Sequence, residues 1–228
     1  MHYFIRLCLN LYKINNTGDL SAYCSPLFID DQEIPLIVTM TAEHIVGLNA
    51  STGEMAWAVE NKNENSIHAN TPVYANNMIL CASADKSCTM LRLSDGGRKA
   101  TIAWEIPELD NLIGALVKIG DYIYGSSSGY NAARNWYCVD WETGKILYRD
   151  RRQLAMGVSI AADGMLYCYT NRGEMALVKP TPEKFDVVSK FFITKGTDQH
   201  WAHPVIYQGT LYVRHGDSLM AYKISITN

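Results

Sequence analysis

Asp31-Gln32-Glu33-Ile34-Pro35-Leu36-Ile37-Val38 is the first of five short segments that decide the fold of this chain. Each has a turn residue followed by alternating apolar or aromatic residues, and the other four are Asn76-Asn77-Met78-Ile79-Leu80, Gly120-Asp121-Tyr122-Ile123-Tyr124, Gly164-Met165-Leu166-Tyr167 and Gly209-Thr210-Leu211-Tyr212. Successive segments begin 45, 44, 44 and 45 residues apart. A fixed period of this size, built from strands and turns, predicts the blades of a β-propeller.

A second pattern repeats with the same period. Asn49-Ala50-Ser51-Thr52-Gly53 leads to Trp57, and Asp140-Trp141-Glu142-Thr143-Gly144 leads to Tyr148. Such turns are closed by side-chain-to-backbone hydrogen bonds and by a glycine with positive φ. The aromatic residues at the ends, with Trp104 in the second unit, are expected to be structural, because a large ring can cover the neighbouring sheet.

These patterns predict an all-β chain, a single propeller domain over residues 1–228 with about five four-stranded blades. The approximate units are 22–66, 67–111, 112–153, 154–199 and 200–228. The fifth unit ends after its third strand, and Phe4–Leu11, within residues 1–21, alternates like a strand that can supply the missing outer strand. Either the ring closes in this way, or the chain is part of a larger ring, or it is an open arc. An open arc exposes an edge strand and favours a homo-oligomer.

The composition is that of an ordinary soluble globular protein, with 48% hydrophobic residues, 19% charged residues and a formal net charge of −3. This balance gives no long-range attraction to nucleic acid or to anionic lipid, so neither is expected as a partner. The apolar start of the chain is interrupted by Arg6 and Asn10. It is too short to span a bilayer and lacks the pattern of a signal peptide, and we predict no membrane insertion.

The chain has six cysteines: Cys8, Cys24, Cys81, Cys88, Cys138 and Cys168. No two are adjacent, and none forms a C-x-x-C pair. Most lie in apolar strand patterns, where a buried free thiol is expected. Cys81 and Cys88 flank a predicted hairpin, and they either remain free or pair in an oxidising compartment.

Four stretches resemble the quinoprotein-like (PQQ-repeat) β-propellers. They are Ala162-Asp163-Gly164-Met165-Leu166-Tyr167-Cys168, the run from Arg172 to Pro182, Trp201-Ala202-His203-Pro204-Val205, and the run from Leu211 to Asp217. The resemblance covers about residues 22–224 and is closest to a branch of exported bacterial propellers. The superfamily includes quinone-dependent alcohol dehydrogenases and the lipoprotein scaffold of the outer-membrane protein assembly machine. The resemblance implies a periplasmic or exported location, and its usual seven or eight blades suggest that this chain is truncated.

The same resemblance raises the question of a cofactor. Quinoprotein dehydrogenases hold pyrroloquinoline quinone beside Ca²⁺, stacked between a Trp and a disulfide of adjacent cysteines. This chain has no adjacent cysteines, no haem-binding motif and no recognisable calcium-loop spacing. We therefore predict no catalytic residues and no resident cofactor, with quinone and calcium kept for the alternative.

Candidate binding residues lie where inner strands begin, at the predicted mouth of the central channel. They are His68, Asn70, Met156, His200, Trp201 and His203. Zinc needs three or four converging ligands, and only the three histidines are candidates, so no metal site is predicted. The histidines either contact a ligand or are hydrogen-bonded to backbone.

Two hairpin loops add further candidates. The loop from Gly125 to Trp136 carries Tyr130, Arg134 and Trp136, residue types common in binding hot spots. Alternatively, Trp136 packs as the start of the next strand. The second hairpin carries Arg214, His215 and Asp217, which either contact a ligand or make an ion pair between blades.

The preferred interpretation is a non-catalytic propeller acting as a binding or scaffold module for a protein, peptide or glycan. The alternative is a quinone-dependent alcohol dehydrogenase or a degenerate remnant of one. A glycan-active enzyme of the five-blade type would need carboxylates at the channel mouth, and none aligns there.

Overall fold

The structure is a computed structural model that describes residues 18–63, 65–84, 86–114, 116–128 and 134–224. Within these ranges the chain is all-β, with strands in five antiparallel sheets and one short 3-10 helix, η1 (Asp95–Gly97). The predicted fold class is therefore confirmed: five sheets of three or four strands each, of the kind that form propeller blades. Among the described residues, no helix is long and apolar enough to cross a membrane.

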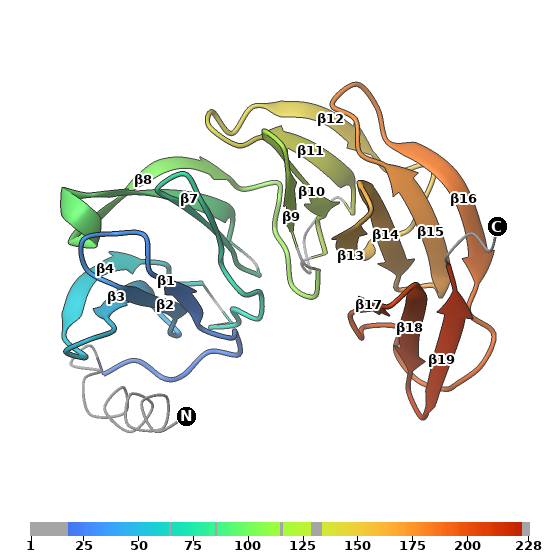
Figure 1. Ribbon diagram of the computed structural model, residues 1–228, viewed down its shortest axis with the longest axis horizontal. Helices are drawn as coiled ribbons and strands as arrows, with labels where there is room; N and C mark the ends of the chain where they lie inside the picture. The colour runs from blue at the N-terminus through green and yellow to red at the C-terminus, as the bar shows by residue number, and fades with distance from the viewer. Residues whose placement is uncertain (1–17, 64, 85, 115, 129–133, 225–228) are drawn as a thin grey trace. The chain divides into compact units, whose positions relative to one another are not determined.

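The chain divides into two compact units, Met1–Leu112 and Ile113–Asn228, each described by itself. The first unit holds two sheets, made of β1 (Leu27–Ile29), β2 (Leu36–Met40), β3 (His44–Asn49) and β4 (Met55–Glu60), and of β5 (Val73–Ala75), β6 (Met78–Ala82), β7 (Cys88–Ser94) and β8 (Lys99–Ile106). In each sheet consecutive strands lie side by side (Figure 1). The prediction of a single domain over 1–228 stays a prediction.

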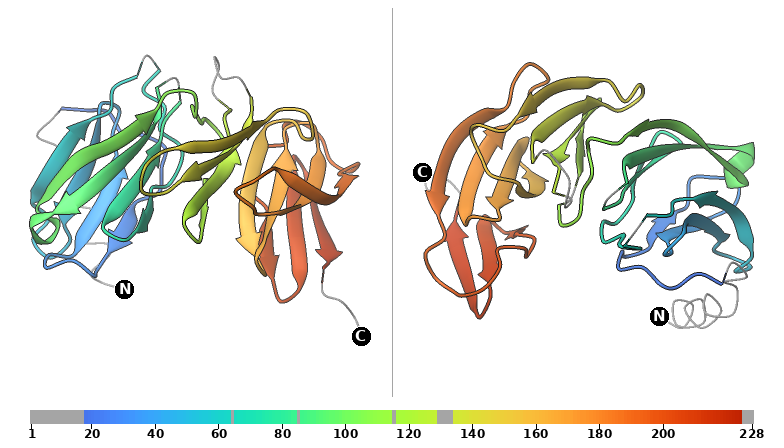
Figure 2. Two further views of the ribbon diagram at one scale, coloured as in Figure 1. Left: turned by 90° about the horizontal axis from the view of Figure 1, so that it is seen from above. Right: turned by 180° about the vertical axis from the view of Figure 1, so that it is seen from behind.

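The second unit holds three sheets, which Figure 2 shows from two further sides. Their strands are β9 (Val117–Ile119), β10 (Tyr122–Ser126), β11 (Trp136–Asp140) and β12 (Ile146–Asp150); β13 (Gly157–Ala162), β14 (Met165–Thr170), β15 (Glu174–Lys179) and β16 (Asp186–Phe192); and β17 (Val205–Tyr207), β18 (Thr210–His215) and β19 (Ser218–Lys223). Among the described residues, β19 pairs only with β18. The predicted closing strand Phe4–Leu11 lies outside the described residues.

Three of the repeated segments form tight two-residue hairpins with two positive φ values, each between the first two strands of a sheet. Asn76 and Asn77 have φ of 52° and 58° between β5 and β6, and Asp163 and Gly164 have φ of 52° and 71° between β13 and β14. Gln208 and Gly209 do the same between β17 and β18. Two positive φ values in succession belong to the hairpin turn whose twist matches that of the flanking strands. The same turn geometry therefore recurs at these three positions of the 45-residue repeat.

The second repeated turn also has the predicted chemistry. Asn49 Oδ1 accepts the backbone N–H of Ser51 at 2.9 Å, and Asp140 Oδ1 accepts that of Thr143 at 2.9 Å. Gly53 and Gly144 follow with φ of 79° and 69°. The hydroxyl of Thr143 donates to Asp140 at 2.7 Å, and this bond is the largest of the effects that lower the pKa of the Asp140 carboxyl.

Trp57 contacts both sheets of the first unit. Its indole lies on β4 with 8% exposure, and its Nε1 donates at 3.1 Å to the carbonyl of Gly97 in η1, which connects β7 and β8 of the second sheet. The ring occupies the space beside Gly47, where an added Cβ would lie 2.2 Å from the indole. Ile29, Leu36, Ile79 and Leu91 complete this core.

In the second unit, Trp136 and Ser126 connect neighbouring sheets. The Trp136 ring is 1% exposed and stacks on Phe185, with ring centroids 5.2 Å apart. Ser126 Oγ donates to the carbonyl of Gly157 at 2.7 Å and accepts the Gly157 N–H at 3.0 Å. The backbone of β13 is therefore bound directly to the end of β10.

The cysteines that the structure describes are all free thiols: Cys24, Cys81, Cys88, Cys138 and Cys168. Cys81 and Cys88 are fully buried and unpaired, so the free-thiol alternative holds. Burial raises the pKa of both thiols far above the ordinary value.

Replacing Trp57 by Ala should destabilise the first unit, because it removes the ring that fills the space beside Gly47 and the hydrogen bond to Gly97. The expected loss is about 3–5 kcal/mol in the free energy of unfolding, measured by chemical denaturation. Trp201, 52% exposed, is the control. Trp201→Ala should change stability by less than about 0.5 kcal/mol, and a similarly small effect of Trp57→Ala would contradict the packing role.

Candidate functional site

The predicted channel-mouth residues come from both units of the chain. His68 and Asn70 belong to the first unit, whereas Met156, His200, Trp201 and His203 belong to the second. Each group is described within its own unit. Among the described residues, no three His, Cys, Asp or Glu side chains are grouped so as to hold a metal ion.

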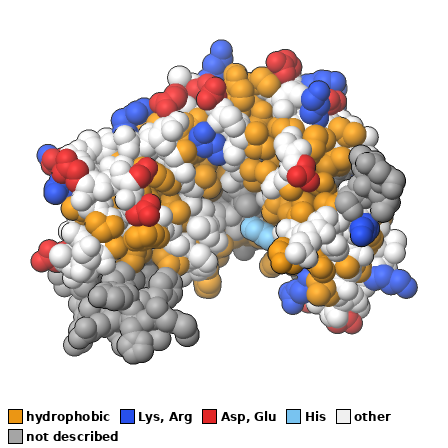
Figure 3. Space-filling view, in the orientation of Figure 1, with side chains coloured by type: hydrophobic (Ala, Val, Ile, Leu, Met, Phe, Trp, Pro, Cys, Tyr) orange, Lys and Arg blue, Asp and Glu red, His pale blue; other side chains and the backbone are white. Residues whose placement is uncertain are grey.

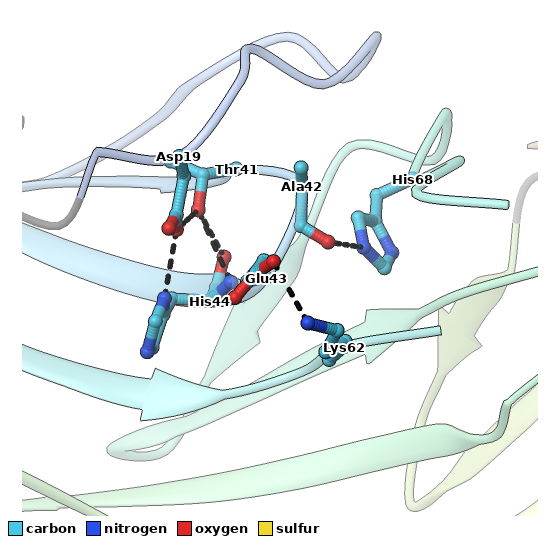
Figure 4. Close-up of polar contacts among 7 residues, drawn as sticks. All are labelled: Asp19, Thr41, Ala42, Glu43, His44, Lys62 and His68. Carbon is cyan, nitrogen blue, oxygen red and sulfur yellow. Dashed lines mark hydrogen bonds and ion pairs between the residues drawn. The ribbon is translucent and has the colours of Figure 1, made fainter. Parts of the chain in front are cut away.

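His68 is fully enclosed and is part of a polar network, of which Figure 4 shows the contact with the carbonyl of Ala42. Its Nε2 donates to the carbonyl of Ala42 at 3.2 Å, while its Nδ1 accepts from Asn61 Nδ2 at 3.4 Å. Asn61 Nδ2 also donates to Ser83 Oγ at 2.8 Å. Burial lowers the pKa of the imidazole, which suits the neutral tautomer that this pattern requires. His68 is therefore a buried residue hydrogen-bonded to backbone, which is the second of the two interpretations of the histidines.

The remaining contacts of this region also hold the fold together. Asn70 is buried and donates to the carbonyl of Asn111 at 2.9 Å, so it is another internal residue. His44 Nδ1 lies 2.7 Å from Asp19 Oδ2 (Figure 4). Asn70 is enclosed, and His44 is partly exposed beside the buried carboxylate of Asp19.

His200 and His215 form a stacked pair in the second unit. Their ring centroids are 3.6 Å apart, and the Tyr169 hydroxyl lies 2.5 Å from His200 Nδ1. The two nitrogens of His215 lie 2.8 Å from the carbonyls of Lys195 and Asp198. Burial, and then the neighbouring His215, lower the pKa of His200. The pair fastens the connection between β16 and β17 to the β18–β19 hairpin, so both histidines are structural.

Other predicted residues remain accessible. Trp201 is 52% exposed, and His203 is exposed with its Nε2 3.3 Å from the carbonyl of Ile113. Arg214 and Asp217 are exposed on the last hairpin. Tyr130 lies outside the described residues. Trp136 begins β11 as a core residue rather than a ligand contact, because its ring is enclosed against Phe185.

Met156 and Arg134 contribute to a pocket of about 420 Å³ in the second unit. Its walls come from the segment before β11, the connection between β12 and β13, the turn between β14 and β15, and the sides of β15 and β16. The lining residues are Arg134, Arg151, Arg152, Gln153, Leu154, Ala155, Met156, Asn171, Arg172, Glu174 and Lys190.

The connection from Arg151 to Met156 is held by hydrogen bonds at several points. Asp150 Oδ1 accepts the backbone N–H groups of Arg152 and Gln153, both at 3.1 Å. Trp136 Nε1 donates to the carbonyl of Ala155 at 2.9 Å. The backbone N–H of Asn171 donates to the carbonyl of Met156 at 2.9 Å. This wall of the pocket is therefore fixed by the core.

The pocket is strongly basic although the chain has a formal net charge of −3. Five basic side chains and one carboxylate give its lining a formal charge of +4. Lys190 neutralises that carboxylate, with its Nζ 2.8 Å from Glu174 Oε1. The sequence patterns did not predict this site as a whole. The adjacent arginines Arg151 and Arg152, which follow a strand, are the part of the pocket that can be recognised in the sequence.

The last sheet presents a second kind of surface. Val205, Tyr207 and Leu219 are 56%, 62% and 70% exposed, and they alternate with partly buried residues along β17 and β19. Figure 3 shows hydrophobic side chains on the surface of this part of the second unit, at the lower right. We call the side with Val205, Tyr207, Tyr212, Leu219 and Ala221 the open face.

The family model described as outer membrane protein assembly factor BamB matches residues 17–182. The chain belongs to this family of PQQ-type β-propellers. A search of curated proteins gave no match for this member of the family.

Solved structures share the fold of this BamB-family chain. A europium-containing methanol dehydrogenase matches with a TM-score of 0.63 and 11% identity over 92% of this chain and 52% of its own. The computationally designed Ika8 protein matches with a TM-score of 0.59 and 11% identity over 90% of this chain and 58% of its own. The computationally designed Ika4 protein matches with a TM-score of 0.50 and 13% identity over 72% of this chain and 93% of its own. The chain spans little more than half the length of the first two. At this identity the likeness concerns the fold alone.

The fold raises the question whether this family member could hold a quinone beside calcium. The described cysteines are all unpaired and mostly buried, and the described His, Cys, Asp and Glu side chains form no metal-binding group. The donor set in the described part of the chain therefore does not fit a quinone stacked on a disulfide beside a calcium ion. We derive no step through that cofactor.

The neutral, buried His68 predicts a pH dependence of the first unit. Because the folded pKa lies below the ordinary value of 6.5, the unfolded chain binds the proton more readily. Stability should be fully present above pH 6.5 and fall as the pH is lowered toward the folded pKa. His68→Gln should cost stability at neutral pH and flatten this decline, as measured by denaturation between about pH 5 and 8. Asn70→Ala is the control, because it removes a buried side chain that does not titrate and should leave the shape of the decline unchanged. A decline unchanged in His68→Gln would contradict the assignment.

Proposed function

We propose that this chain is a non-catalytic propeller module that docks a partner protein on the open face of its last sheet. The observation that carries the proposal is the contrast between the two sides of that sheet. One side is packed in the core and the other exposes large apolar side chains. The family description, an assembly factor for outer membrane proteins, supports a protein-docking role and an exported location.

The strand register separates the two sides of the sheet. Val205 lies opposite Tyr212, which lies opposite Ala221, and Arg214 lies opposite Leu219. Directly opposed residues share one side of an antiparallel sheet, so these five lie on the open face. The other side, with Ile206, Leu211, Val213, Met220 and Tyr222, packs with Val158, Tyr169, Met175 and Ile193.

The chemistry of the open face defines its partner. Val205, Tyr207 and Leu219 supply an apolar centre, and Tyr is a residue type enriched in binding hot spots. Arg214 and Lys223 lie exposed on the same side of the sheet. The matching surface is therefore apolar with acidic groups around it. A broad sheet face of this kind suits a protein better than a glycan or a single peptide segment.

Replacing Leu219 or Tyr207 by Asp should abolish docking, because a carboxylate would then lie in the apolar centre. A photo-crosslinking residue at position 207 first identifies the partner in cells that make the chain. The two purified proteins are then titrated by calorimetry. Each substitution should weaken the complex at least tenfold, corresponding to about 1.4 kcal/mol or more.

Val188→Asp is the matched control, because Val188 is 57% exposed on β16 and lies outside the open face. It should leave the affinity unchanged. Crosslinks only between two copies of this chain would assign the face to self-association and overturn the proposal. Crosslinking at position 207 no stronger than at position 188 would also overturn it.

The alternative function, a quinone-dependent alcohol dehydrogenase, predicts a different response. Pyrroloquinoline quinone with Ca²⁺ would then raise the melting temperature and support dye-linked oxidation of an alcohol. For a docking module we expect neither effect. Oxidation that depends on both the quinone and Ca²⁺ would establish the alternative and contradict the non-catalytic assignment.

A further inference from the structure

We propose that the basic pocket of the second unit binds a small polyanion, a molecule with several carboxylate or phosphate groups. The pocket is separate from the open face and is lined by different residues. The proposal therefore does not rest on the docking function.

The first argument is the charge left without a partner. Lys190 and Glu174 neutralise each other at 2.8 Å. Within the described part of the chain, the guanidinium groups of Arg134, Arg151, Arg152 and Arg172 make no hydrogen bond or ion pair with another residue. Four such groups around one cavity repel one another. An anion in the cavity would relieve that repulsion, and guanidinium forks match carboxylate and phosphate oxygens geometrically.

The second argument is that two of these arginines project from a fixed segment. Arg151 and Arg152 begin the connection that Asp150 caps at one end, and Trp136 holds the same connection through Ala155. Gln153 adds a side-chain hydrogen bond to the carbonyl of Phe185. The backbone that carries the two arginines is therefore ordered before a ligand arrives, which lowers the entropic cost of binding.

The third argument is size. A volume of about 420 Å³ lies within the range of roughly 300–1,000 Å³ that is typical of small-molecule pockets. Leu154, Ala155 and Met156 give one wall an apolar part, so the site is more than a charged patch on the surface. These dimensions suit a compact ligand such as a tricarboxylate or a bisphosphate.

Asn171 adds a fourth feature. It lines the pocket, and its Oδ1 is buried without a hydrogen-bond partner. A buried acceptor in this state is stabilised by any donor that reaches it. A hydroxyl group on the ligand would supply that donor, so hydroxylated polyanions should bind best.

Calorimetric titration of the full chain with citrate, tricarballylate and pyrophosphate tests the proposal. Citrate and tricarballylate carry the same three carboxylates, but only citrate has a hydroxyl group. We expect citrate to bind more tightly than tricarballylate, and Asn171→Ala to remove the difference. Pyrophosphate shows whether phosphate oxygens are preferred over carboxylate oxygens. Binding should weaken as NaCl is raised, because the attraction is electrostatic.

Arg151→Gln and Arg172→Gln should each weaken binding about tenfold, because a charge-assisted hydrogen bond is lost. Lys145→Gln and Lys179→Gln are the matched controls. They remove the same charge from exposed positions of the same unit outside the pocket and should leave the affinity unchanged.

Circular dichroism and the melting temperature confirm that each variant folds. The proposal is overturned if none of the three anions binds, or if the arginine variants bind as well as the lysine controls. Equal binding of citrate and tricarballylate would overturn the role given to Asn171. A higher melting temperature with citrate, lost in Arg151→Gln, would support the site independently of calorimetry.

Discussion

The second unit depends on the burial of one indole ring. Trp136 is enclosed against Phe185, and its N–H must find an acceptor because an unpaired buried donor is costly. The acceptor is the carbonyl of Ala155, in the connection that leads from the third sheet to the fourth. The same indole therefore packs the core and fixes the position of this connection. The first unit repeats the principle, since Trp57 donates to the carbonyl of Gly97 across its own pair of sheets.

The same constraint explains how the chain tolerates a cluster of unneutralised arginines. Exposed charges of like sign destabilise a fold only modestly, whereas a well-packed ring contributes several kcal/mol. The connection is fixed by Trp136 and by Asp150, so the backbone that carries the exposed Arg151 and Arg152 is held in place. A concentration of like charge on a segment positioned by a core contact is typical of a binding site rather than of a structural element.

Much of the fold could be predicted because its signals are local. The turns at Asn49 and Asp140 are determined by a side chain and the two or three residues after it, and the hairpin at Asp163-Gly164 by two backbone conformations. Such signals survive in a single sequence. The site could not be predicted as a whole, because its residues come from separate segments that meet only through packing. For a related reason the sequence left the roles of His68 and His215 open: burial depends on neighbours distant in the sequence.

The histidine pair connects the two functional surfaces proposed for the second unit. His200 packs against the turn at Gly173, where an added Cβ would lie 2.8 Å from its ring, and this turn follows Arg172 of the pocket. His215 lies on β18 and holds the carbonyls of Lys195 and Asp198, in the segment that leads to β17 of the open face. The pocket rim and the open face are thus tied to one stacked pair.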